Sequence, residues 1–203
     1  MRKVYPLFLL AILPTPTAAQ TAARDSVSYD LVPPSRLEVR TGKAGLLGFA
    51  GHDHVIRARS FSGRIVFYPD QLTASHVTVS VPTDSLEVIT PPDTAEIRKV
   101  TAAMREDVLD AAHFPEITLT GRAVERAGDT VRVDAILTMK GQSQNVPLIV
   151  GAGLGADTVR ATTTFTVNQT DFGIRPYRGG PGGTVRVADR VTFIIEAIAV
   201  RRQ

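Results

Sequence analysis

The stretch Phe49 to Asp70, FAGHDHVIRARSFSGRIVFYPD, decides the fold that the sequence predicts. In its second half Gly63, Ile65 and Phe67 fall on one face and Ser62, Arg64 and Tyr68 on the other, and this period of two is typical of a β-strand with one buried face. We interpret the stretch as two strands folded back on each other, ending at the turn residues after Phe67. A lone hairpin is at best marginally stable in water, so its apolar face needs further strands to cover it.

The rest of the chain supplies such strands at regular intervals. In the clearest of them Leu137 and Met139 share a face with three other apolar residues, opposite a charged and polar face. Together with the first pair the count is eight or nine antiparallel strands, which is the size of a small closed barrel whose interior is filled by side chains or holds one ligand. The further segments with this alternation are 36–41, 76–81, 116–120, 130–140, 142–150, 159–167 and 185–200.

One segment has a helical period instead. Apolar residues at Ile97, Val100, Met104 and Val108 lie three or four positions apart, as on one face of an α-helix, and Pro115 stops a helix that approaches it. The predicted fold class is therefore all-β: a closed antiparallel barrel with one inserted α-helix at about 94–111.

The chain begins with the pattern of a secretory signal peptide. Residues 1–19 combine a basic start, a short apolar run and small residues before a cleavage site, which we place after Ala19 or Ala23. Residues 20–34 are then expected to form a flexible lead-in. The single folded domain is expected at 35–203, and the protein in the periplasm or secreted.

Composition excludes several classes of function. Arg2 and Lys3 belong to the expected signal peptide, so the mature chain is nearly neutral, and without a basic cluster no nucleic-acid partner is expected. There is no cysteine, which excludes disulfides and thiolate chemistry. The outward charges Arg36, Glu38 and Arg40 cannot face lipid, so we do not expect the barrel to span a membrane. A homodimer is compatible with the sequence.

Five groups of residues, spread over most of the chain, resemble the motifs of one known family. They are FSG at 61–63, FPEI at 114–117, AILTMKG at 135–141 followed by VPL at 146–148, DFGI at 171–174 and VADRV at 187–191. In these motifs the chain is similar to the YceI-like proteins, the polyisoprenoid-binding, lipocalin-like family of bacterial periplasms. It departs from the family at Tyr29-Asp30-Leu31, which lacks the frequent Trp, and at Asn168-Gln169-Thr170, where an Arg is usual.

The resemblance implies an eight-stranded, lipocalin-like barrel around a long apolar tunnel. The implied partner is an isoprenoid lipid with a polyprenyl or quinone-like tail, carried in the periplasm without enzymatic activity and without another cofactor. Asp171 to Ile174 is interpreted as a tight turn in which Asp171 caps local backbone N–H groups and Phe172 fills the core. The residues expected to bind the ligand are Ile65, Phe67, Leu137, Met139, Phe165 and Phe193 along the tail, with His52, His54 and Arg175 near the head group.

Two alternatives stay open. His52 and His54 have a His-x-His spacing from which both imidazoles can reach one metal ion, so the chain could be a metal-binding protein or a zinc-dependent enzyme, provided that a third ligand converges on them. The other is a stress or interaction protein with a filled barrel and no ligand. The sequence has no G-x-S-x-G elbow and no glycine-rich phosphate loop followed by Lys, which favours a binding role over catalysis.

The inward assignment of Leu137 and Phe193 gives a first prediction. Replacing either residue by Asp puts a carboxylate into the barrel interior, where an ionised group without a partner is strongly unfavourable, so the variant should lose lipid retention or fail to fold. Circular dichroism and lipid extraction measure the two outcomes. A folded variant that retains lipid would show that the side chain does not face inward.

Overall fold

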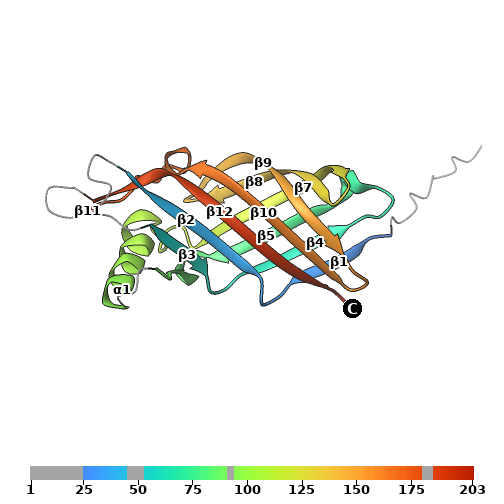
Figure 1. Cartoon of the computed structure of the whole chain (residues 1–203), viewed down its shortest axis with the longest axis horizontal. Coiled ribbons are helices and arrows are strands. Elements are labelled where there is room, and N and C mark those ends of the chain that lie inside the picture. The colour runs from blue at the N-terminus through green and yellow to red at the C-terminus, as the bar shows by residue number, and fades with distance from the viewer. Residues whose placement is uncertain (1–24, 45–52, 91–93, 180–184) are drawn as a thin grey trace, which may run out of the picture.

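The protein, seen here in a computed structural model, is an elongated barrel with one helix packed at one end (Figure 1). The structure describes residues 25–44, 53–90, 94–179 and 185–203. The predicted signal peptide and the residue His52 lie outside these ranges. So does the residue before the helix, Asp93.

Eight antiparallel strands form a closed ring, as the sequence predicted. The pairing runs from one strand to the next and returns to its start, because the first and last strands pair with each other through Tyr29 and Arg201. The ring confirms the predicted fold class, a closed, eight-stranded, lipocalin-like antiparallel barrel. In spatial order the ring contains β1 (Val27–Leu31), β4 (Ser62–Phe67), β5 (His76–Pro82), β7 (Glu116–Ala127), β8 (Thr130–Met139), β9 (Gln142–Leu154), β10 (Thr158–Asn168) and β12 (Val185–Arg201).

A second set of strands extends the barrel toward the helix. The last strand is long enough to pair with β1 near its C-terminal end and with β2 over Arg36 to Ala44 near its start. The extension then continues through β3 to β6. Its members are β2 (Arg36–Ala44), β3 (His54–Ala58) and β6 (Leu86–Val88), and the two-residue β11 (Arg178–Gly179) pairs with β12.

The predicted hairpin within Phe49–Asp70 is wrong. Both strands exist, but β3 pairs with β2 and β6, whereas β4 pairs with β1 and β5. The connection at Arg59 leads the chain from the extension into the ring, and Arg59 N–H bonds the carbonyl of Ser85 on the way. Alternation of residue types fixes which face of a strand is buried but not which strand lies beside it.

The lead-in predicted for 20–34 is wrong over Val27–Leu31, which form β1. Tyr29 is only 5% exposed and packs with Val159 and Ala199 inside the barrel. This strand closes the ring: it pairs with β4 over Val27 to Asp30 and with β12 over Tyr29 to Leu31.

The predicted helix is present but ends earlier than residue 111. An α-helix, α1 (Thr94–Ala103), continues into a π-helical turn, η4 (Met104–Val108). Asp110 then adopts a left-handed conformation with φ 53°, which stops the helix. His113 Nδ1 lies 2.7 Å from the Asp110 carboxylate, and this hydrogen bond holds the pKa of Asp110 below its usual value.

The described ranges also contain three short 3-10 turns: η2 (Leu72–Ala74), η3 (Thr83–Ser85) and η5 (Gln169–Phe172). The last contains the predicted tight turn. Its residue Phe172 is completely buried and Gly173 has a φ of 67°, so the prediction that Phe172 fills the core is confirmed. The cap is not made by Asp171: the Asp189 carboxylate accepts the Thr170 N–H at 2.9 Å and the Thr170 hydroxyl at 2.7 Å.

The ladder between β9 and β10 is short. It covers Gly151 to Leu154 on β9, although β9 pairs with β8 from Gln142 onward. Pro147 lies in the part of β9 that is paired on one side, and proline has no N–H to donate to a ladder. Just beyond the end of the ladder, the Thr163 hydroxyl donates to the Ile149 carbonyl at 2.9 Å.

Gly121 gives a prediction about the packing of the barrel wall. A Cβ added there would lie 2.7 Å from Val133 Cγ1 and 3.2 Å from Val77 Cγ1, inside a tight interior, so Gly121→Ala should destabilise the fold by about 1–3 kcal/mol. Gly153→Ala is the matched control on β9, because a Cβ there meets nothing within 4 Å. Urea denaturation measures both, and equal stabilities would contradict the inward position of Gly121.

Candidate functional site

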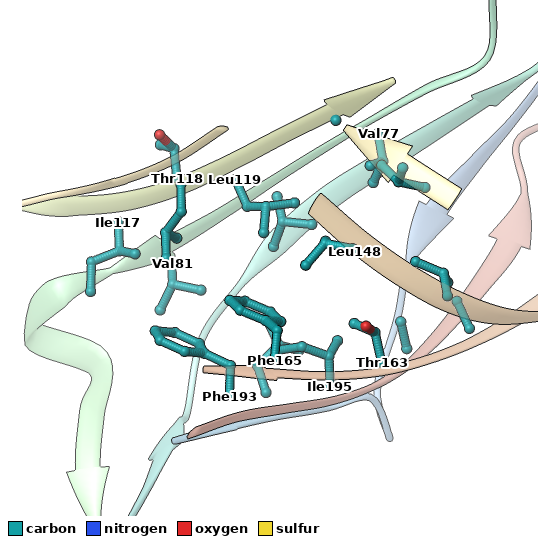
Figure 2. Close-up of a pocket in the computed structure, with 18 of the residues that line it drawn as sticks. Val77, Val81, Ile117, Thr118, Leu119, Leu148, Thr163, Phe165, Phe193 and Ile195 are labelled. Atoms are coloured by element: carbon teal, nitrogen blue, oxygen red, sulfur yellow. The ribbon is translucent and has the colours of Figure 1, made fainter. Parts of the chain in front are cut away.

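The barrel encloses an apolar cavity of about 320 Å³. This volume is in the range of natural ligand pockets, which are mostly apolar and concave. Figure 2 shows the wall side chains of Val81, Leu119, Leu148 and Ile195 reaching into the same space from different strands. The cavity is therefore a direct product of strand alternation, since every second residue of each strand faces inward.

Two stacked aromatic rings lie in the wall of the cavity. Phe165 on β10 and Phe193 on β12 are cross-strand neighbours, and their ring centroids lie 4.8 Å apart with an interplanar angle of 4°. Both rings contact the cavity in Figure 2. They present a flat, rigid hydrocarbon surface to whatever occupies it.

Partial exposure of inward residues distinguishes this cavity from a filled core. Phe165, Phe193, Ile65 and Phe67 face the interior, yet each is only partly buried, whereas Phe172 is completely buried. Close-packed cores leave few voids larger than a water molecule, so inward side chains normally lose all their exposed surface. The accessible surface of these four residues faces the cavity that they line.

Three small residues, which we call the alanine level, lie side by side in the wall of the cavity. Ala152, Ala161 and Ala197 are direct neighbours across β9, β10 and β12, and all three line the cavity. On these three strands, no larger side chain enters the cavity at the alanine level.

The helical segment covers one end of the cavity. Met104, Val108 and Leu109 contribute to the lining, and Met104 is only 8% exposed because it also packs against residues of β3 and β6. Two cations hold this segment on the barrel: Arg105 Nε donates to the Leu86 carbonyl at 2.8 Å, and Lys140 Nζ donates to the Val108 carbonyl at 2.9 Å.

The opposite end of the cavity reaches the surface. Its lining extends to Leu154, which is 44% exposed, and to Arg126, which is also exposed. These residues stand beside the turns that join β9 to β10 and β7 to β8. The cavity thus has a covered end at the helix and an accessible rim at the other.

Six of the nine residues predicted to bind a ligand line this cavity: Ile65, Phe67, Leu137, Met139, Phe165 and Phe193. Their contact with a ligand stays a prediction. Leu137 and Met139 are 2% and 5% exposed, so they serve the core as well as the wall.

The predicted head-group residues do not join them. His52 lies outside the described residues, and neither His54 nor Arg175 is part of the lining. Arg175 is exposed and directly follows Ile174, which packs near the helical end. The Nδ1 of His54 lies 3.0 Å from the Thr90 carbonyl oxygen, so a local backbone contact occupies one of its ring nitrogens.

Within the described ranges, no three His, Asp or Glu side chains come together as a metal site. The other two histidines, His76 and His113, make local contacts with Ala74 and Asp110. Because His52 is not described, metal binding by the His52/His54 pair stays an untested prediction.

Arg126 is a charged lining residue that the sequence did not reveal. Simple alternation from Ala123 would place Glu125 inward, but a bulge between Ala123 and Glu125 shifts the register, and Arg126 instead pairs with the inward Val131. A bulge adds one residue to one strand and reverses the faces beyond it. Nothing in the local composition marks it in advance.

Comparison with known families decides the identity of the fold. A family model described as the YceI-like domain matches residues 35–199. The chain belongs to the YceI-like family. The match covers the ring except β1 and the last two residues of β12, and it agrees with the family resemblance of the sequence motifs.

Solved structures share the YceI-like fold at low sequence identity. BcnA of Burkholderia cenocepacia is 16% identical with a TM-score of 0.63, over 82% of this chain and 96% of that chain. A polyisoprenoid binding domain from Saccharophagus degradans, implicated in plant cell wall breakdown, is 14% identical with a TM-score of 0.63, over 87% and 99%. The YCEI protein of Campylobacter jejuni is 15% identical with a TM-score of 0.55, over 73% and 84%.

A search of curated proteins gives no match. Among the described residues, no helix has the length and hydropathy needed to cross a membrane.

Proposed function

We propose that this YceI-like protein binds and carries an isoprenoid lipid, with the tail in the barrel cavity. The observation that carries the proposal is the apolar cavity itself, whose inward residues keep accessible surface instead of closing on one another. A saturated or isoprenoid chain has few polar atoms, and its affinity comes from removing hydrocarbon from water. Each methylene-sized unit contributes about 0.8 kcal/mol.

The shape and lining of the cavity favour a chain over a compact polar ligand. Polar side chains contribute little to the lining, and the aromatic stack and the alanine level offer contact surface without directed hydrogen bonds. The same lining favours a binding role over a catalytic one. The S. degradans neighbour, whose description names polyisoprenoid binding, is consistent with this ligand class.

We place the protein in the periplasm or outside the cell. The support is the signal-peptide pattern of residues 1–19 and membership of the YceI-like family. A water-filled compartment between membranes requires a shield for the tail of any lipid that crosses it, because exposed hydrocarbon is unfavourable in water.

Replacing an alanine of the alanine level by a bulky residue tests whether the lipid tail lies in the cavity. Ala161→Phe places a ring in the cavity between Ala152 and Ala197 and should lower the affinity for geranylgeraniol by about tenfold or more, since the added ring takes the place of several methylene-sized contacts. Thr162→Phe is the matched control, because the next residue of β10 faces outward and is exposed. Titration of delipidated protein measures both.

The proposal fails if delipidated, folded wild-type protein does not bind the isoprenoid. It also fails if Ala161→Phe and Thr162→Phe bind it equally well while thermal unfolding shows both variants to be folded, because the tail would then lie elsewhere.

A further inference from the structure

Arg126 is an unusual member of the cavity lining. The other lining residues near the accessible rim are mostly aliphatic, among them Val131, Ala152 and Leu154. The guanidinium makes one hydrogen bond to the described part of the protein, from Nε to the Gly128 carbonyl at 2.9 Å. This bond fixes the Nε edge on the β7–β8 turn and leaves the two terminal nitrogens without a protein acceptor among the described residues.

The β-bulge places Arg126 on the opposite face of the wall from Glu125 and Asp134. Glu125 pairs with Arg132 across β7 and β8, with 3.5 Å between the Glu125 carboxylate and a terminal Arg132 nitrogen. Asp134 lies 3.8 Å from the same guanidinium. These three charges form a group on the outer face, while Arg126 stands opposite Val131 on the inner face.

The acidic residue within the cavity lining does not neutralise Arg126 either. This residue is Glu38 on β2, which the sequence predicted to face outward, and Arg57 binds its carboxylate through two nitrogens at 2.5 and 2.8 Å. The rim therefore carries a positive charge whose partner is not supplied by the described side chains.

We propose that Arg126 binds an anionic head group, a phosphate or carboxylate, on a lipid whose tail occupies the cavity. This inference rests on the proposed function and specifies the ligand class. Guanidinium presents a planar set of donors that matches the oxygens of phosphate and carboxylate, and such charge-assisted bonds are stronger than neutral ones. With the tail inside, the head group emerges at the rim, where it stays in contact with water and within reach of Arg126.

A turn-stabilising role is the structural alternative for Arg126. The Nε bond to Gly128 alone would serve that role, since Gly128 has a φ of 59° in a tight turn. The two roles differ in what they require: the turn needs a hydrogen-bond donor, whereas an anionic head group needs the charge. Arg126→Gln keeps a donor and removes the charge, so it separates them.

The test compares two ligands with the same tail. Full-length mature protein, delipidated and folded, is titrated with geranylgeranyl monophosphate and with geranylgeraniol at low ionic strength. We expect wild type to prefer the phosphate by about tenfold, and Arg126→Gln to lose most of this preference without losing affinity for the alcohol. Arg132→Gln is the matched control on the outer face and should keep the preference.

Inorganic phosphate distinguishes a lipid head group from a free anion. It should not displace geranylgeranyl monophosphate at millimolar concentration, because the tail supplies most of the affinity. Displacement would overturn the assignment to a lipid.

Three further results would each overturn the inference. If neither ligand binds, the proposed function fails and the inference fails with it. If both ligands bind wild type equally, the cavity binds isoprenoids but the head-group assignment is wrong. If the preference for phosphate survives in Arg126→Gln, another residue holds the anion.

Discussion

The pairing of β1 with β12 is the constraint on which the rest of the structure depends. Tyr29, Asp30 and Leu31 pair with Arg201, Val200 and Ala199, and this short ladder turns an open sheet into a closed ring. Closure removes the exposed edges along which sheets aggregate. It also gives the alternate residues of all eight strands one shared interior, separated from water by the wall that they form.

The interior is a cavity rather than a core because of which side chains face it. Large residues fill the helical end, where Phe172 and Ile174 are buried with Met139. Further along, alanines take the inward positions on three adjacent strands, and the stacked rings of Phe165 and Phe193 lie flat in the wall. The small side chains leave part of the interior unfilled. This space is lined by hydrocarbon, so a water molecule inside it would find few hydrogen-bond partners.

Much of this could be predicted from the sequence, and the failures have physical causes. The period of two placed Leu137, Met139, Phe165 and Phe193 inward, because side chains alternate strictly along a strand. The partner of each strand was not predictable in the same way, since the pairing of β3 and β4 depends on contacts remote in sequence.

Short or irregular elements were missed for related reasons. Val27–Leu31 follow a polar segment and have too few residues for a clear period, yet they close the ring. The helix stops at Val108 because of the backbone conformation near Asp110, which no apolar pattern encodes. Arg126 faces inward only because of a bulge, so the rim of the site was visible in the structure alone.

The central claim is that the cavity holds an isoprenoid lipid, and one measurement tests it most directly. Mature protein is purified without detergent, extracted with organic solvent and compared by mass spectrometry with a mock purification. The account predicts a near-stoichiometric species with an isoprenoid tail that is absent from the mock sample. A lipid-free extract from well-folded protein that also takes up no added isoprenoid would contradict it.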